Sequence, residues 1–232
     1  MNSVNILSGG AAQGLVASFA ATFKTRTGFE IGGEFGAVGA MADKLRNGAP
    51  TDLIILTAAL AAQLAGEGLV VQASITDVGT VETALAVRSG DPRLSVRNTD
   101  ELRAAFLAAD AIFVPDIKAS TAGIHVADVL ERLGIADTVS ARLQVYPNGA
   151  TAMRHLAAST AARPIGCTQS TEIISTEGIA LSGALPPGCE LKTTYTAAVT
   201  TGAKSPAEAK ILIDLLTSPA AHAARSRAGF VS

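Results

Sequence analysis

The sequence predicts an α/β fold in which helices pack on mostly parallel sheets. Short apolar runs alternate with longer segments whose apolar residues recur at helical spacing, and this rhythm is typical of parallel sheets. The run LIIL within residues 51–56 has no polar residue, as expected of a strand buried on both faces. Hydrophobic residues make up 48% of the chain and aromatic residues only 4%, so small aliphatic side chains allow close packing of helices on a sheet.

The first part of the chain contains three strand–helix pairs. Gly28 ends the first helix, and Gly48 with Pro50 ends the second, because glycine and proline terminate helices. We expect strands at 4–7, 29–35 and 51–56, and helices at 14–28, 39–50 and 57–68.

The alternation continues through residue 202, with helix starts marked by hydroxyl residues. Thr99, Ser120 or Thr121, and Ser170 are expected to cap three of these helices, since short polar side chains bond the free N–H groups of a first turn. We expect strands at 81–90, 111–116, 141–147, 163–169 and 191–202, and helices at 99–109, 120–135, 149–159 and 170–178.

Two helices, at 205–218 and 219–229, are expected to end the chain. Ser205 and Glu208 have the spacing of a capping box, and Pro206 suits the first helical position.

Charge, hydropathy and cysteine content exclude several classes of function. The net charge is −2 without a basic run, which argues against a nucleic-acid partner. No apolar run approaches the length of about 20 residues that a membrane span needs, so no membrane insertion is expected. Cys167 and Cys189 form no paired CxxC motif, so we expect no metal and no cofactor; Cys167 is interpreted as a buried thiol and Cys189 as a loop thiol, rather than as a disulfide.

Residues 5–19, NILSGGAAQGLVASF, place two glycines between a strand and a helix, where backbone N–H groups can approach an anion. The segment lacks the GK[ST] of a phosphate loop and the G-x-G-x-x-G spacing of a dinucleotide site. A tight turn without a ligand is the alternative.

An ordered series of segments resembles the molybdate-binding family of type II periplasmic solute-binding proteins, in a branch similar to aconitate isomerases. The features are the opening strand and small-residue turn, GAPTDLII, STAGIHVADVLERLGI, NGATAMRHL, TTYTAAV and the tail SPAAHAARSRAGF. The resemblance implies two α/β lobes, each a mostly parallel sheet flanked by helices, with a ligand cleft between them. Lobe 1 would comprise residues 1–80 and 196–232, and lobe 2 residues 81–195, with two crossing strands as a hinge.

The resemblance also implies where an anion is held. The corresponding positions are Ala11 in the first turn, with Gly9 and Gly10 beside it, Val38, Ala122, Pro147 or its neighbour Asn148, and Tyr195. Molybdate binders normally have serine at the first two of the five positions. Ala11 and Val38 remove two hydroxyl donors, and each unmet buried charged group costs about 1–3 kcal/mol or more. We therefore expect a small organic di- or tricarboxylate rather than molybdate.

Several polar residues are candidates for contact with this ligand. Ser8, at the strand end, is either a hydroxyl donor or a turn residue. Ser120 and Thr121 stand at a helix start that suits a carboxylate, and the alternative is pure capping. Lys118 would supply a positive charge, or is a solvated loop lysine.

Three residues have acid–base chemistry that an isomerase would need. His125, Lys118 and Tyr195 are expected to be catalytic only if the protein shifts a double bond by removing and returning a proton. Structural roles are the alternative for His125, and His155 and His222 are interpreted as structural.

Two functions of different classes remain open. The first is a carrier that binds the anion by lobe closure and delivers it to an ABC transporter. The second is a cofactor-independent, aconitate-isomerase-like enzyme. We expect a monomer, periplasmic if a leader has been removed and cytoplasmic if Met1 is the natural start.

Overall fold

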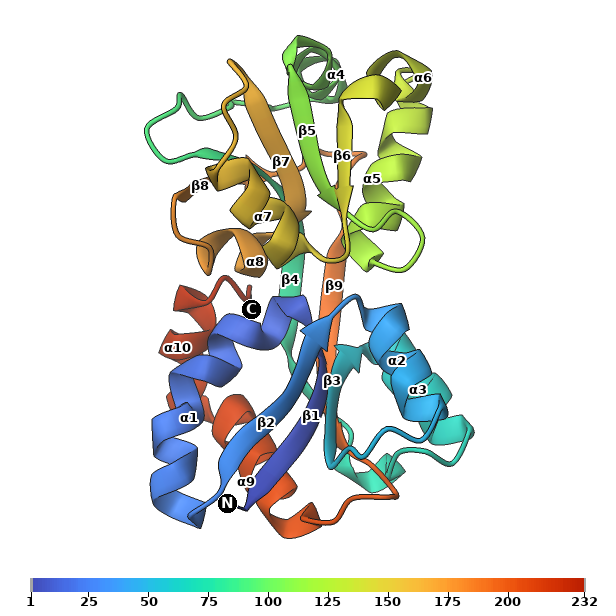
Figure 1. Ribbon diagram of the computed structural model, residues 1–232, viewed down its shortest axis with the longest axis vertical. Helices are drawn as coiled ribbons and strands as arrows, with labels where there is room; N and C mark the ends of the chain where they lie inside the picture. Colours follow the sequence, from blue (N-terminus) through green and yellow to red (C-terminus); the bar gives the residue numbers. More distant parts are fainter. Residues whose placement is uncertain (1, 232) are drawn as a thin grey trace. The chain divides into compact units, whose positions relative to one another are not determined.

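The computed structural model describes residues 2–231, and the chain forms two compact units (Figure 1). Unit 1 comprises residues 1–81 and 193–232, and unit 2 comprises residues 82–192. The chain leaves unit 1 within β4 (Thr76–Arg88) and returns to it at the beginning of β9 (Lys192–Val199).

The sheet of unit 1 has the strand order β2-β1-β3-β9. Its other strands are β1 (Ser3–Gly9), β2 (Glu30–Gly36) and β3 (Leu53–Thr57). β1 is parallel to both β2 and β3, whereas β9 is antiparallel to β3. Because β1 and β2 run in the same direction, the two helices that follow them begin at the same edge of the sheet.

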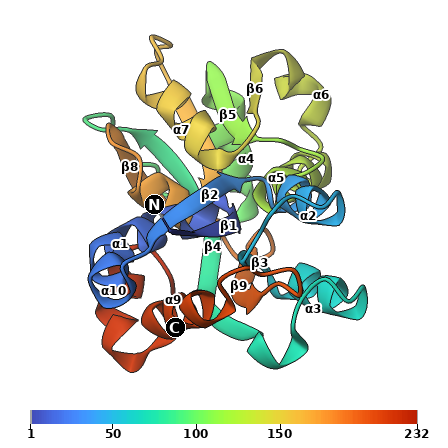
Figure 2. The same cartoon turned by 60° about the horizontal axis from the view of Figure 1, so that its bottom comes forward.

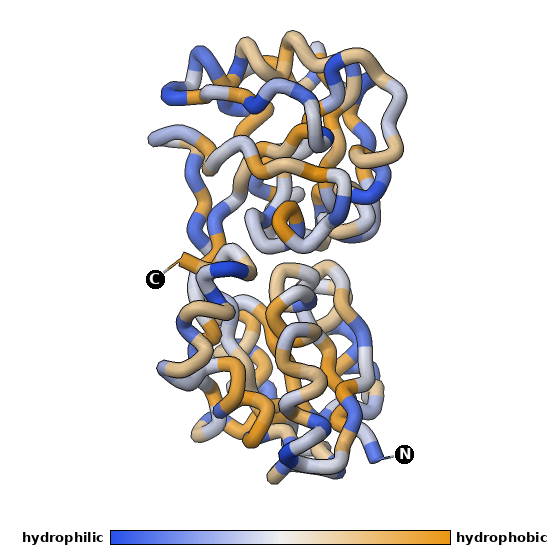
Figure 3. Tube along the Cα trace, turned by 90° about the vertical axis from the view of Figure 1, so that its left-hand side faces the viewer, coloured by the Kyte–Doolittle hydropathy of each residue, from blue (hydrophilic) through white to orange (hydrophobic). Residues whose placement is uncertain are grey.

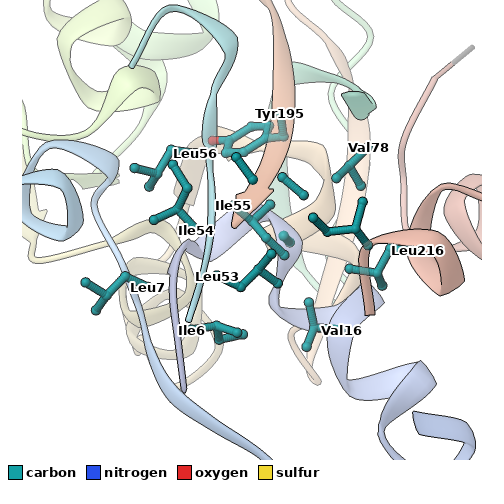
Figure 4. Packing of buried hydrophobic residues seen from close by; sticks show 14 of the residues in the cluster. Ile6, Leu7, Val16, Leu53, Ile54, Ile55, Leu56, Val78, Tyr195 and Leu216 are labelled. Carbon is teal, nitrogen blue, oxygen red and sulfur yellow. The ribbon is translucent and has the colours of Figure 1, made fainter. Parts of the chain in front are cut away.

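Helices cover both faces of this sheet (Figures 1 and 2). On one face lie α1 (Gln13–Thr27), α9 (Pro206–Thr217) and α10 (His222–Arg227); on the other lie α2 (Val38–Arg46) and α3 (Ala58–Gly66). Short 3-10 turns occur at Gly10–Ala12, Gln72–Ser74 and Pro219–Ala221. The core is almost entirely aliphatic, and β3 contributes four consecutive side chains that are completely buried (Figure 4): Leu53, Ile54, Ile55 and Leu56.

Unit 2 is built on the strand order β4-β7-β5-β6, with β8 paired to the other side of β4. The strands are β5 (Ala111–Pro115), β6 (Leu143–Tyr146), β7 (Pro164–Gln169) and β8 (Ile179–Ala184). β5 is parallel to β6 and β7, whereas β4 is antiparallel to β7 and β8.

Two separate apolar clusters cover the faces of this second sheet. One is formed with α4 (Thr99–Ala108), α5 (Thr121–Arg132) and α6 (Ala136–Val139), and a 3-10 turn follows at Ser140–Arg142. The other is formed with α7 (Gly149–Ala157) and α8 (Ser170–Ile174). Colouring by hydropathy shows the hydrophobic stretches of each unit interrupted by hydrophilic helix and loop segments (Figure 3).

Cys167 and Cys189 are both free and buried. This agrees with the prediction that they do not form a disulfide. They belong to the cluster that packs α4 and α5 against the sheet of unit 2. Burial raises the pKa of the Cys167 thiol.

The sequence analysis missed or misplaced some elements of unit 2. It placed no strand at 179–184, whose residues IALSGA show neither clear alternation nor a long apolar run. The helix expected over 170–178 ends at Ile174, and Gly178 adopts a φ of 81° just before β8. The strand expected at 81–90 instead begins at Thr76.

Three capping assignments outside α5 were also wrong. Asn98, not Thr99, caps α4, because its side chain accepts from the N–H of Glu101. Gln169 is the residue that precedes α8, so Ser170 is the first helical residue and not the cap.

The third wrong assignment concerns α9, at which Ser205 has the N-cap position but makes no side-chain capping bond. The buried carboxylate of Asp52 replaces the expected capping box. It accepts hydrogen bonds from the backbone N–H groups of Lys204 and Ser205 at 2.7 and 2.9 Å, and from that of Asn5 at 2.8 Å. A single carboxylate therefore joins the amino end of β3 to β1 and to the start of α9.

Substitution Asp52→Asn should destabilise the protein by about 2–4 kcal/mol, because an amide cannot accept all three hydrogen bonds and leaves buried N–H groups unmet. The measurement is the midpoint of urea unfolding. Asp43→Asn removes an exposed carboxylate and serves as the control, with a small effect expected. Equal midpoints for the two variants would contradict this role of Asp52.

Candidate functional site

Three helix starts that follow parallel strands have no side-chain cap and are the candidate anion sites. The first four N–H groups of a helix have no partner within the helix and attract anions. No side chain caps the 3-10 turn that leads from β1 into α1, nor the starts of α2 and α5. In parallel sheets such helix starts, beyond the carboxyl ends of strands, are the usual position of ligands.

In unit 1, Gly9 is the last residue of β1 and lies at the candidate site. A Cβ atom at this position would lie 2.7 Å from Cε1 of Tyr195 and 2.8 Å from Cγ1 of Val38. The Tyr195 ring and the Val38 side chain therefore pack directly over the glycine backbone. Only glycine allows this close approach.

The site of unit 1 combines backbone donors with an apolar surface. Ala11, Val38 and Tyr195 are all buried and belong to the core cluster. Tyr195 lies opposite Thr57 in the pairing of β9 with β3, at one end of the aliphatic cluster (Figure 4). The side chains of Ala11 and Val38 thus fill space in the core.

Ser8 occupies a different position from that of a ligand donor. Its side chain is completely buried, and its hydroxyl donates to the carbonyl oxygen of Gly9 at 2.9 Å. This geometry favours the turn role that the sequence analysis kept as the alternative.

In unit 2, the turn between β5 and α5 is fixed by Asp116. Its carboxylate accepts from the N–H groups of Lys118 and Ala119 at 2.7 and 2.9 Å, and its carbonyl oxygen accepts from the N–H of Ser120 at 3.1 Å. A Cβ atom at Gly123 would lie 2.1 Å from that carbonyl oxygen, so the first turn of α5 sits tightly on the strand end.

The candidate residues of unit 2 are arranged around this turn. Ser120 precedes α5 and makes no side-chain capping bond, so the role of pure capping is wrong for it. Ala122 is buried, Thr121 is half-buried, and Lys118 is exposed. The ammonium group of Lys118 is thus carried by a rigid backbone next to an open helix start.

His125, the fifth residue of α5, has a hydrogen-bond partner within unit 2. Its Nε2 atom lies 2.8 Å from the carbonyl oxygen of Cys189, so Nε2–H donates and ties α5 to the loop before β9. The lone pair is then on Nδ1, the only ring nitrogen left for proton transfer.

His155 and His222 lie outside the open helix starts. The ring of His155 stacks on Tyr146 with centroids 4.2 Å apart, and His222 is an exposed residue of α10. These positions agree with the structural roles expected for both.

The start of α7 differs from the three open starts, because its own chain satisfies it. The side chain of Asn148 accepts from the N–H of Thr151 at 2.8 Å. The carboxylate of Glu172 accepts from the N–H groups of Gly149 and Ala150. Asn148 is therefore a helix cap, and its carbonyl-type oxygen is engaged.

Glu172 is a buried carboxylate at the start of α7 that the sequence analysis missed. It is 5% exposed, and it also accepts the Thr168 hydroxyl at 2.6 Å and the N–H of Gln169. Burial raises the pKa of Glu172, while these hydrogen bonds act in the opposite direction. Its only signal in the sequence is an acidic residue within the otherwise uncharged segment GCTQSTEII.

Residues 2–231 contain neither a metal-ligand cluster nor a membrane-spanning helix. No group of three or more His, Cys, Asp or Glu side chains is arranged to hold a metal ion there. Nor is any helix in that range long and apolar enough to cross a bilayer.

Comparison with known proteins gives matches along nearly the whole chain. The family model described as bacterial extracellular solute-binding protein matches residues 4–231. Aconitate isomerase from a Pseudomonas species is 24% identical over 229 residues, covering 94% of this chain and 83% of that protein.

Solved structures match as completely. The periplasmic molybdate-binding protein of Azotobacter vinelandii has a TM-score of 0.81 at 20% identity, covering 99% of both chains. The sulfate-binding protein SubI of Mycobacterium tuberculosis H37Rv has a TM-score of 0.72 at 18% identity, covering 99% of this chain and 86% of the other. These matches confirm the α/β fold class expected from the sequence.

Substitution Gly9→Ala should displace the Tyr195 ring and cost about 1–3 kcal/mol, because the new methyl group overlaps two packed side chains. The chain has only two tyrosines and no tryptophan, so near-UV circular dichroism reports the change directly. Gly202→Ala is the control, since a Cβ atom there meets nothing within 4 Å. An unchanged tyrosine spectrum in Gly9→Ala would refute the packing described for this site.

Glu172 should make stability depend on pH in a defined direction. Because its pKa in the folded protein is raised, its contribution is fully present below the pKa of the unfolded chain and is lost as the pH rises through the folded-state pKa. The wild-type urea midpoint should therefore fall relative to that of Glu172→Gln as the pH rises through this interval. Glu177→Gln, which changes an exposed glutamate, should follow the wild-type curve; parallel curves for wild type and Glu172→Gln would show that the prediction is wrong.

Proposed function

Because the chain belongs to the bacterial extracellular solute-binding protein family, we propose that it binds a small organic anion, with a di- or tricarboxylate as the leading class. The observation that carries this proposal is the set of uncapped helix starts that follow β1, β2 and β5. Each presents backbone N–H groups and the positive end of a helix dipole, which favour carboxylate oxygens.

We propose candidate anion contacts in each unit by itself. Gly9, Gly10 and the turn at Ala11 would supply backbone donors in unit 1, beside Tyr195. Ser120, Thr121 and Ala122 at the start of α5 would bind a second anionic group, and Lys118 would add a positive charge. Ser8 and Asn148, whose side chains are engaged elsewhere, would act by shaping the two turns.

The apolar part of the site supports a carbon-containing ligand. A tetrahedral oxyanion places hydrogen-bond acceptors in every direction, and each unmet buried acceptor costs about 1–3 kcal/mol. Ala11 and Val38 offer only methyl groups at two of the positions expected to face the anion. The methylene carbons of a carboxylic acid need no hydrogen bond and fit such a surface.

An aconitate-isomerase-like enzyme is the second candidate, favoured by the 24% identity to the Pseudomonas protein. In this reading, Nδ1 of His125 would remove a proton next to a carboxylate and return it to another carbon. Lys118 or the Tyr195 hydroxyl would stabilise the charge that develops on the carboxylate. The hydrogen bond from His125 to Cys189 would then orient the imidazole ring.

For the carrier, we propose capture of the anion in the periplasm and delivery to the membrane component of an ABC transporter. The shared fold of the molybdate- and sulfate-binding proteins supports this setting, as does the family to which the chain belongs. The ligand class distinguishes this chain from those two proteins.

A titration with two sets of anions tests the proposal. Molybdate, tungstate, sulfate and phosphate form one set, and succinate, citrate, cis-aconitate and trans-aconitate form the other. A ligand at a hundred times its Kd should add about 2.7 kcal/mol of stability, visible as a rise in Tm. Response to a carboxylate supports the proposal, whereas response only to the inorganic oxyanions refutes it.

Proton NMR of the carboxylate that binds then separates carrier from enzyme. Interconversion of cis- and trans-aconitate, abolished in His125→Gln but retained in His155→Gln, would support the isomerase. A bound aconitate that stays unchanged would support the carrier.

The double substitution Ala11→Ser with Val38→Ser should raise the affinity for molybdate by about tenfold or more, because two hydroxyl donors are restored. Isothermal titration calorimetry measures the change. The double variant Ala11→Gly with Val38→Ala removes bulk without adding donors and should show no such gain. Equal molybdate affinity in both variants would contradict the role given to the missing hydroxyls.

A further inference from the structure

Three of the N–H groups at the start of α7 have acceptors within unit 2. Those of Gly149 and Ala150 donate to the Glu172 carboxylate, and that of Thr151 donates to the side chain of Asn148. The N–H of Ala152 makes the first ordinary helical bond, to the carbonyl oxygen of Asn148 at 3.0 Å. Three of the four groups that a helix start leaves unpaired are thus satisfied within unit 2.

The Glu172 carboxylate occupies the place that an external anion would take. A Cβ atom at Gly149 would lie 1.9 Å from Oε2 of Glu172 and 2.2 Å from Oγ1 of Thr168, so the carboxylate rests directly on the glycine backbone. Its four partners, the Thr168 hydroxyl and the N–H groups of Gln169, Gly149 and Ala150, are all hydrogen-bond donors. This is the donor set of an anion site, filled by a side chain from α8.

We propose that Glu172 is a specificity-determining residue, because its carboxylate acts as an internal ligand that withdraws the start of α7 from ligand binding. Anions then bind to unit 2 only at the start of α5, the open helix start near Lys118. When it is ionised, the carboxylate also disfavours ligands that bring an additional anionic group toward α7. This inference rests on the proposed function only where it concerns the external ligand.

The first experiment needs no knowledge of that ligand. Glu172→Ala removes the carboxylate and leaves four donors around a cavity of carboxylate size. Sodium formate should raise the Tm of this variant in a saturable manner, relative to sodium chloride of equal concentration. Wild type and Glu177→Ala, which truncates an exposed glutamate on the same segment, should respond equally to the two salts.

The outcomes of this experiment decide the internal-ligand claim. A formate-specific rise in Glu172→Ala alone supports it. Equal responses to formate and chloride overturn it. If Glu172→Ala does not fold in chloride, folding in formate supports the proposal, and failure to fold in both salts counts against it.

The second experiment tests the effect on specificity with Glu172→Gln, which keeps the shape of the side chain and removes its charge. Succinate and tricarballylate, which differ by one carboxylate, are the probes in calorimetry at fixed ionic strength. The ratio of tricarballylate to succinate affinity should rise by about threefold or more, and should stay at the wild-type value in Glu177→Gln. A smaller rise overturns the specificity role. If neither probe binds any of the proteins, the proposed function fails, while the formate experiment still decides whether Glu172 is an internal ligand.

Discussion

Unpaired backbone N–H groups at helix starts are the constraint on which both the fold and the site depend. Each such group must be bonded to a protein acceptor or left accessible to solvent or ligand, because burying it unmet costs as much as a lost hydrogen bond. The chain supplies acceptors for α3 with Thr57, for α4 with Asn98, for α7 with Asn148 and Glu172, and for α9 with Asp52. The starts after β1, β2 and β5 have no side-chain capping bond. These uncapped starts are the ones at which we propose anion binding.

Much of this arrangement follows from local sequence. Apolar spacing and terminating glycines predicted most strands and helices, because these signals act within a few residues. Gly28, for instance, adopts a φ of 74° and is the C-cap of α1, as its position after an apolar run indicated. The small-residue turn at 9–12 was likewise recognised as a place where backbone approaches an anion. Gly9 in this turn has a second role that the sequence does not reveal, since the absence of a side chain makes room for the Tyr195 ring from β9.

The misjudged features depend on partners that are distant in sequence. Ser205 and Glu208 have the spacing of a capping box, but Asp52 binds the same helix start from 153 residues away. At α7, the side-chain oxygen of Asn148 is a cap, and the distant Glu172 carboxylate accepts two further N–H groups. In the sequence, Glu172 stands among threonines and a glutamine, a composition that suggests an exposed helix start rather than a buried carboxylate. Only the pairing of β7 with its neighbours brings it to Gly149.

The buried thiols have a consequence for where such a protein can operate. Thiol–disulfide exchange requires a thiolate that a partner can reach. Burial keeps the Cys167 thiol protonated by raising its pKa, and both sulfur atoms lie within the packed interior of unit 2. Neither oxidants nor reductants in the surroundings should then alter the covalent structure of the folded chain. The folded chain should thus keep both thiols free in oxidising and in reducing surroundings.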